Sequence, residues 1–172
     1  SLASDTKMSV IPIRDALARL QQEGLVEGES GRGWRVSEYD QESLKQVSEV
    51  REALECQVVR LASVRATTED LEELELLARQ ADRETSPEKV NLIDGKFHLR
   101  LAEAAKNPRL YTAIEREHVL ELIFGDPVPS IPNNHCDLVH AIASGDPDVA
   151  ESEMRKHLAI LPTLSDAKKP DK

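Results

Sequence analysis

The sequence has 172 residues, of which 40% are hydrophobic and only 3% aromatic, so aliphatic side chains must form most of its core. It contains no run of about 18 apolar residues and no start typical of a signal peptide, which argues against a membrane-spanning protein and for a cytoplasmic one. Its two cysteines, Cys56 and Cys136, fit neither a disulfide framework nor a zinc knuckle, in keeping with a reducing compartment.

The net charge of −10 argues against a generally basic nucleic-acid-binding protein. This charge is unevenly distributed along the chain. Residues 1–36 hold five basic and five acidic side chains and are neutral overall, whereas the remaining residues hold 17 basic and 27 acidic ones. A neutral head followed by an acidic body suggests two modules with different tasks.

The head begins with an amphipathic helix followed by two short strands. Ser9 suits the N-cap of this helix, Pro12 falls within its first turn, and Gly24 ends it. The strands are expected at Leu25–Glu27 and Trp34–Ser37, around a hairpin tip with three glycines. This order is the outline of a winged helix-turn-helix, although a plain surface helix would show the same apolar stripe.

From about residue 40 the pattern is helical, and no strand is expected after residue 37. The expected helices are Gln41–Arg65, one starting at Thr67 or Thr68, Ser86–Lys106, Asn107–Phe124, His135–Ala143 after a proline-rich break at 125–134, and one starting at Asp146. The expected fold class is mostly α, with three regions. These are a winged helix-turn-helix over residues 1–38, an all-α antiparallel helical bundle over 39–163, and a disordered tail over 164–172.

The head resembles the DNA-binding domain of GntR-type transcription regulators, which are bacterial proteins. The shared pattern is Ser-x-x-Pro-(Val/Ile)-Arg-x-Ala-Leu, then Leu-x-x-(Glu/Gln)-Gly-Leu-Val, then a Gly-Arg-Gly wing. The matching positions are Ser9, Pro12, Ile13, Arg14, Ala16, Leu17, Leu20, Gly24, Leu25, Val26, Gly31, Gly33 and Val36. The resemblance implies that the helix enters the major groove and the wing approaches the minor groove. The implied DNA-contacting residues are Ser9, Val10, Ile11, Arg14, Gly31, Arg32 and Gly33.

Within this surface the resemblance implies separate roles. Arg14 contacts a phosphate or a base edge, Ser9 and the helix N-terminus hold phosphate, and Arg32 adds charge to the wing. The sequence departs from the family at Val10 and Ile11, where Arg and Thr are usual; these apolar side chains suit thymine methyl groups but lose a phosphate or guanine contact. The family's first helix is missing before the first residue, so a partial domain is expected.

The body resembles the FCD ligand-binding domain of the FadR-like GntR subgroup, over roughly residues 41–160. The matching segments are "VREALECQVVRLAS", "DGKFHLRLAEAAKNPRL" and "HCDLVHAIASGDPDVAESEMRKHL". With the head, the resemblance covers nearly the whole chain. It implies an effector-binding and dimerising helical domain whose ligands are small metabolite carboxylates.

A candidate metal site starts from Asp94 and His98, which lie four residues apart on one helix face. A single pair of this kind is usually a surface hydrogen bond. His135 and His157 mark the last two helices, where an antiparallel bundle can bring them to the first pair, and the resemblance favours this four-residue site. One carboxylate and three imidazoles suit Zn²⁺, with Ni²⁺, Mn²⁺ or Fe²⁺ as alternatives, and not Ca²⁺.

Three further residues are candidates for the effector pocket. Arg51 shares a helix face with Glu55, so an ion pair is one reading, and the resemblance suggests that Arg51 reaches a ligand carboxylate. Asn107 is a helix cap or a pocket contact, and His118 is an ordinary surface or core histidine or a pocket contact. His140 lies about 140° around its helix from the candidate ligand five residues earlier, so it is expected to face elsewhere.

The leading hypothesis is a metabolite-responsive transcription repressor that is not an enzyme. Its partners would be operator DNA, a small carboxylate and a second copy of the chain, with no membrane. The alternative is a metal-dependent hydrolase in a helical bundle, but the sequence shows no HExxH motif and no nucleophile in a recognisable setting. A helical dimerisation module with a vestigial head is the third possibility.

Overall fold

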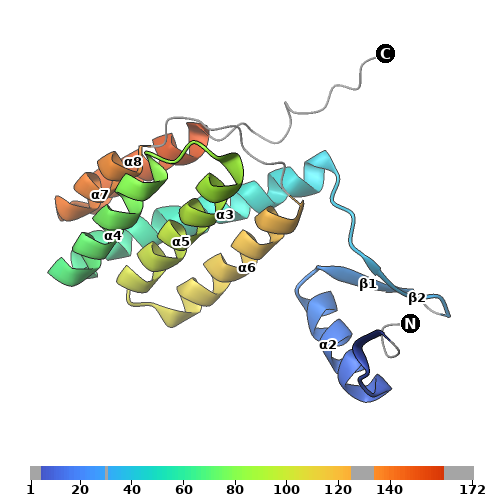
Figure 1. The fold of residues 1–172 in the computed structure, drawn as a ribbon. Helices are drawn as coiled ribbons and strands as arrows, with labels where there is room; N and C mark the ends of the chain where they lie inside the picture. Colours follow the sequence, from blue (N-terminus) through green and yellow to red (C-terminus); the bar gives the residue numbers. More distant parts are fainter. Residues whose placement is uncertain (1–4, 30, 125–133, 161–172) are drawn as a thin grey trace, which may run out of the picture. The chain divides into compact units, whose positions relative to one another are not determined.

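The computed structural model describes residues 5–29, 31–124 and 134–160, and most of these are helical (Figure 1). The chain divides into two compact units, Ser1–Tyr39 and Asp40–Lys172. The elements of the first are α2 (Val10–Gln22), β1 (Val26–Glu29) and β2 (Gly33–Val36). Those of the second are α3 (Gln41–Arg65), α4 (Thr68–Ala81), α5 (Pro87–Ala104), α6 (Pro108–Phe124), α7 (His135–Ala143) and α8 (Pro147–Ile160). The predicted tail and nearly all of the proline-rich break lie outside the described residues.

In the first unit, α2 starts and stops where the sequence predicts. Ser9 is its N-cap residue with an extended backbone. Gly24 adopts a positive φ of 81°, a conformation that residues with a side chain rarely adopt. Its N–H bonds to the carbonyl of Gln21, and the N–H of Leu25 bonds to that of Leu20. These bonds satisfy carbonyls of the last turn, so the predicted glycine stop is confirmed.

The two strands pair antiparallel, but their bounds differ from the predicted ones. Pairing runs from Val26↔Val36 to Glu29↔Gly33, which places Gly28 and Glu29 in a strand and not in the hairpin tip. Gly28 lies opposite Trp34, whose ring covers the space beside it. An aromatic ring that covers a glycine in this way compensates for its missing side chain. The glycine-rich composition therefore made the tip look longer than it is.

In the second unit, polar side chains define several helix starts. The Asp40 carboxylate accepts the N–H of Ser43 at 2.8 Å at the start of α3. Thr67, and not Thr68, caps α4 in a capping box with Asp70. Ser86 stands at the N-cap of α5 but makes no capping side-chain bond. That helix ends at Ala104, two residues before the predicted end.

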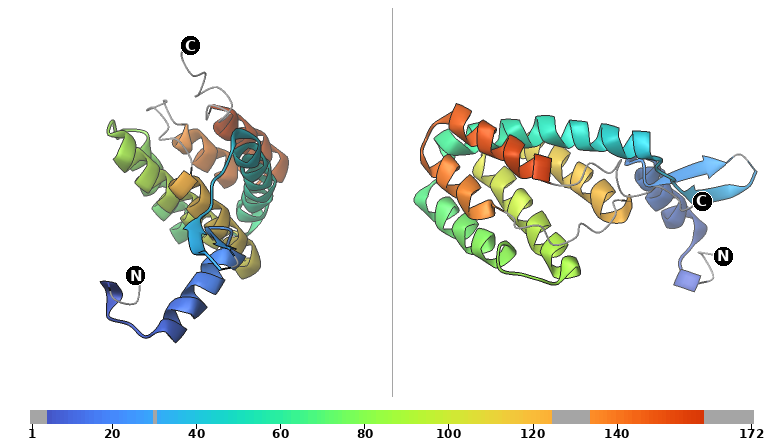
Figure 2. Two further views of the ribbon diagram at one scale, coloured as in Figure 1. Left: turned by 90° about the vertical axis from the view of Figure 1, so that its right-hand side faces the viewer. Right: turned by 90° about the horizontal axis from the view of Figure 1, so that it is seen from above.

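In the second unit α3 contacts α5, α6, α7 and α8, while α4 packs against α5 and α7 (Figure 2). The buried apolar core is mostly aliphatic, with Phe97 and Cys56 beside Val58, Leu74, Leu101, Leu138, Ile142 and Met154. Among the described residues no strand follows Val36, which confirms the mostly helical prediction. No described helix is both long and apolar enough to cross a membrane.

The Asp70 side chain links the start of α4 with α5 and with the segment that follows α5. Its side chain is 6% exposed and accepts hydrogen bonds from Arg100 at 2.6 Å, from Lys106, and from the backbone of Thr67 at 2.8 Å. Burial alone would raise the pKa of Asp70, but the bonds from Lys106, Thr67 and Arg100 outweigh burial and hold that pKa well below its usual range. The ionised carboxylate is therefore part of the folded structure.

We expect Asp70→Ala to lower the free energy of unfolding by about 2 kcal/mol at pH 7, because a cap and two charged partners are lost together. Since folding lowers this pKa, the stabilisation is complete above the unfolded value near 4 and is lost as pH falls toward the folded value. Urea titrations at pH 7 and pH 3 measure both effects. Glu72→Ala, an exposed site on the same helix, is the control, and an equal loss in both variants would contradict the prediction.

Candidate functional site

The four side chains predicted as metal ligands converge inside the helical bundle. Asp94 and His98 come from α5, His135 from the first position of α7, and His157 from α8. One ligand atom of each lies within 4.8 Å of all the others. All three histidines are buried. The structure therefore brings together all four residues from three separate helices.

The four ligand atoms are spaced as they would be around one shared metal ion. His135 Nε2 lies 3.0 Å from Asp94 Oδ1, His98 Nε2 lies 3.6 Å from the same oxygen, and the Nε2 atoms of His98 and His157 are 3.2 Å apart. Two ligands of a tetrahedral Zn²⁺ bound at the usual distance are about 3.3 Å apart. Three nitrogens and one oxygen are also a ligand set that transition metals prefer over Ca²⁺.

The outer nitrogen of each imidazole is held by an acceptor on another element. The three pairs are His98 Nδ1 with Glu55 Oε2 at 2.7 Å, His135 Nδ1 with Asp82 Oδ1 at 2.8 Å, and His157 Nδ1 with Asn134 Oδ1 at 3.0 Å. When Nδ1–H donates to these oxygens, the lone pair of Nε2 points toward the centre of the cluster. Metal-binding histidines are held in this way, which fixes both tautomer and ring orientation.

The electrostatics of the cluster favour a positive charge at its centre. Burial would lower the pKa of His98, but Glu55 and Asp94 outweigh burial and raise it. Burial would likewise raise the pKa of Glu55, yet His98 and then Arg51 hold that carboxyl below its usual range. Burial and the neighbouring charge on His98 lower the pKa of His157 to about 3, so this ring is neutral. The donor set therefore fits a divalent cation, which would bind Nε2 of neutral rings.

Arg51 lies beside this cluster, on α3. Its Nε donates to Glu55 Oε1 at 3.1 Å, so the ion pair suggested by their spacing is present. Its Nη2 also lies 3.8 Å from Asp94 Oδ2, and the whole side chain is only 5% exposed. Arg51 thus places a guanidinium next to the candidate ligand Asp94, and its predicted contact with an effector carboxylate stays a prediction.

The other predicted pocket residues differ in their relation to the cluster. The ring centroid of His118 lies 6.5 Å from that of His98. Asn107 accepts the N–H of Leu110 at 3.3 Å, which is the capping role, and its pocket contact stays a prediction. His140 is exposed and lies outside the four-residue cluster, as expected from its spacing.

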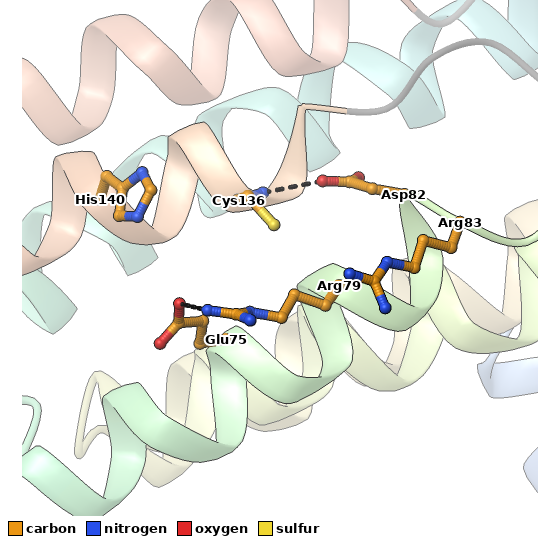
Figure 3. Close-up of a pocket in the computed structure, with 6 residues that line it drawn as sticks. All are labelled: Glu75, Arg79, Asp82, Arg83, Cys136 and His140. Carbon is orange, nitrogen blue, oxygen red and sulfur yellow. Dashed lines mark hydrogen bonds and ion pairs between the residues drawn. The ribbon is translucent and has the colours of Figure 1, made fainter.

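His140 instead lines a surface cleft of about 270 Å³ between α4 and α7 (Figure 3). Figure 3 shows Arg79 paired with Glu75 along one wall of this cleft, and the backbone N–H of Cys136 directed at Asp82. Asp82 is therefore shared between the cleft and the cluster. Its two oxygens accept the first N–H groups of α7 as well as the His135 ring, so it caps that helix and positions a candidate ligand.

In the first unit, the start of α2 presents the predicted DNA-contacting side chains to solvent. The Ser9 side chain makes no capping hydrogen bond. Val10 and Ile11 are 59% and 73% exposed, which is unusual for aliphatic side chains of this size. Arg14, one turn further along the helix, is exposed as well. Among the described residues of this unit, the start of α2 therefore leaves these side chains largely open to solvent.

The hairpin tip and the first residue of β2 present a second exposed surface. Gly31 and Gly33 have φ values of 79° and 97°, and a Cβ built on either meets no atom within 4 Å. Their backbone is therefore accessible, and a side chain would be strained there. Between them, Arg32 is 84% exposed and lies 3.8 Å from Glu29. Such a tip can bring backbone N–H groups and one guanidinium close to a phosphate.

Comparison with known families assigns both units. The family described as "Bacterial regulatory proteins, gntR family" matches residues 1–36, and the "FCD domain" matches residues 46–160. The chain belongs to the GntR family of regulators that carry an FCD domain. Both resemblances seen in the sequence are thereby confirmed. Because the family consists of transcription regulators, the hydrolase alternative is set aside.

Individual relatives support the same family assignment for this GntR regulator. The HTH-type transcriptional regulator LutR of Bacillus subtilis is 29% identical over 92% of this chain and 85% of its own length. RmpR of Mycobacterium gastri is also 29% identical, over 85% of this chain, and the chain spans only 63% of that protein. The E. coli McbR/YncC structure shares the fold, with a TM-score of 0.73 and 24% identity over 92% of this chain and 80% of that one.

Sequence reasoning about this GntR regulator missed the acceptors that hold the rings. The sequence pattern predicts Glu55 only as a partner of Arg51, and it predicts no role for Asn134. Asp82 carried a weak signal, since an acidic residue at the end of a helix opposes the helix dipole and calls for another explanation. Asn134 directly precedes α7, but only the folded chain shows that its side chain reaches His157.

Proposed function

We propose that this chain is a metabolite-responsive transcription repressor of the cytoplasm, in which the helical domain binds a divalent metal and a small organic acid. Residues 1–38 form the DNA-binding domain and residues 39–163 the metal-binding and effector-binding domain. The observation that carries the proposal is the convergence of three imidazoles, each held at Nδ1, on the carboxylate of Asp94. Zn²⁺ is the metal that this ligand set suits, with Ni²⁺, Mn²⁺ or Fe²⁺ as alternatives.

The metal would supply the positive charge that an acidic domain needs to hold an anion. Arg51 adds a second positive group at the same place, because its Nη2 lies 3.8 Å from Asp94 Oδ2. A carboxylate bound beside Asp94 would therefore meet a cation and a guanidinium in a buried, low-dielectric setting, where such contacts are strong. This arrangement supports a small carboxylate as the effector.

A route from the effector to the DNA-binding unit starts at α3. This helix carries both Arg51 and Glu55, and its N-cap, Asp40, is the first residue after the DNA-binding unit. An anion that draws Arg51 away from Glu55 changes the contacts that hold α3 against α5. In this scheme α3 has two arrangements, and each sets a different distance between the DNA-binding units of a dimer. An effector that binds one arrangement more tightly shifts the population toward it and thereby changes the affinity for the operator.

The experiment is a DNA-binding titration with full-length protein and labelled fragments from upstream of its own gene. We expect binding to a roughly palindromic site, a change in affinity on adding one of a panel of small organic acids, and loss of that change with a metal chelator. Specific binding that no acid alters, with or without metal, would contradict the effector part of the proposal. Absence of specific binding would contradict the whole.

We further expect a homodimer, because one winged helix reads too few base pairs to select a genomic site and two half-sites are needed. Sedimentation velocity of the full-length protein at micromolar concentration measures this. The expected result is a single species of twice the chain mass. A species of one chain mass at every concentration up to the micromolar range would refute the dimer.

Asp82→Asn should weaken Zn²⁺ binding by about 10- to 100-fold, the usual effect of changing the partner of a metal-binding histidine. The amide keeps the size of Asp82 but removes the charge that raises the pKa of His135 against the effect of burial. Asp137→Asn, an exposed acid in the first turn of α7, is the matched control. Calorimetric titration of metal-free protein makes the comparison, and equal affinities in the two variants would show that Asp82 does not position the ring.

A further inference from the structure

Gly95 stands in the interior of α5, one residue after Asp94, where glycine is destabilising relative to alanine. A Cβ built on Gly95 would lie 2.1 Å from His118 Nε2, and 3.0 and 3.1 Å from Cδ2 and Cε1 of the same ring. The imidazole of His118 on α6 therefore fills the space that a side chain at residue 95 would take. The glycine is explained by this close approach of a ring to the helix backbone.

The same approach places His118 next to the candidate metal centre without making it a ligand. Its ring centroid lies 6.5 Å from that of His98, with the planes inclined by 35°. It is not among the four side chains whose ligand atoms lie within 4.8 Å of one another. Burial and the charges of Arg51 and His98 lower the pKa of His118 to about 4, so the ring is neutral. A neutral imidazole offers one hydrogen-bond donor and one acceptor.

We propose that Gly95 and His118 form a specificity-determining pair of the effector pocket. Gly95 leaves the space through which the His118 ring reaches the acid bound beside Asp94 and Arg51. This inference rests on the proposed function and adds to it a neutral contact that is selective for shape. Arg51 and a metal attract any carboxylate. A ring fixed against a helix backbone instead distinguishes acids by the substituents next to their carboxylate group.

Any side chain at residue 95 would change this contact. Ordinary contact between a Cβ and a ring begins at about 3.4 Å, so Gly95→Ala must move His118 Nε2 from 2.1 Å to at least that distance. A displacement of more than 1 Å is large for a hydrogen bond, which is lost beyond about 3.5 Å. The three atoms printed nearest to such a Cβ all belong to the His118 ring. The substitution should therefore separate acid binding from metal binding.

The test compares Gly95→Ala, His118→Ala and the double variant in full-length protein loaded with Co²⁺, whose visible absorption reports on its ligands. The probes are acetate, L-lactate, L-malate, citrate and D-gluconate. We expect Co²⁺ affinity within about threefold of wild type in all variants. The acid that wild type binds most tightly should bind about tenfold more weakly to each single variant, as for the loss of one hydrogen bond to a charged group. The double variant should lose no more than His118→Ala, because both changes remove the same contact.

Thermal unfolding supplies a readout that does not depend on the acid. Gly95→Ala should lower the melting temperature when His118 is present and raise it in the His118→Ala background, where the space is open and alanine favours the helix. If Gly95→Ala does not fold, the acid affinities and rank order of His118→Ala still decide the question.

The possible failures are distinguishable. Unchanged acid affinity and unchanged rank order in His118→Ala, with a wild type that responds, would overturn this inference and leave the proposed function intact. A Gly95→Ala substitution that stabilises both backgrounds equally would also overturn it. If none of the five acids alters the Co²⁺ spectrum of the wild type, the proposed effector class fails and this inference with it.

Discussion

Replacement of His157 by alanine is expected to weaken Zn²⁺ binding at least about a hundredfold, more than the loss of any outer partner. His157 supplies one of three nitrogens that face the centre of the cluster, and its Nε2 lies 3.2 Å from His98 Nε2. The fold should survive, because His157 is neutral when buried and Asn134 keeps its hydrogen bond to Glu153. Calorimetric titration of metal-free protein measures the loss.

His140→Ala is the matched control for this experiment, since that histidine is exposed and lines the surface cleft between α4 and α7. It should bind Zn²⁺ as wild type does. A His157→Ala protein that is folded by circular dichroism and binds Zn²⁺ with wild-type affinity would remove His157 from the ligand set. Equal weakening in both variants would indicate binding at scattered surface histidines.

Arg14→Ala is expected to reduce operator affinity by about 10- to 100-fold, which corresponds to the loss of one specific guanidinium contact. Arg14 is exposed in the first half of α2, the part of a recognition helix that reaches base edges. Stability should not change, because the Arg14 side chain is exposed. Fluorescence anisotropy at fixed salt is the measurement, since phosphate contacts make affinity salt-dependent.

Arg19→Ala, in the last turn of the same helix, is the control for charge alone. It should weaken binding less than Arg14→Ala and equally for all DNA sequences. If the two variants lose affinity to the same extent on specific and random DNA, Arg14 contributes only charge and does not read the operator.

Most of the fold could be predicted from the sequence because local signals agreed with one another. Gly24 ends α2 through bonds within a few residues, so the sequence alone predicts this stop. The start of α4 was predicted to within one residue, and the capping box of Thr67 with Asp70 decides between Thr67 and Thr68. The hairpin was predicted less well. Gly28 has the composition of a turn, but the cross-strand ring of Trp34 keeps it in a strand, and such a contact has no local pattern.

The candidate site was likewise predicted only in part. Asp94 and His98 are one helical turn apart, so spacing predicted their shared face. That His135 and His157 join them followed from family resemblance and not from spacing. The partners Asp82 and Asn134 lie 53 and 23 residues from the rings they hold. Gly95 had no visible role until the structure placed a ring from another helix in its side-chain space.

The most direct test of the account is elemental analysis of wild-type protein purified without a nickel resin, combined with acid binding before and after treatment with a chelator. We expect one equivalent of a transition metal per chain, and an organic-acid response that disappears with the metal and returns when the metal is restored. Metal far below one equivalent, together with acid binding that the chelator leaves unchanged, would contradict it.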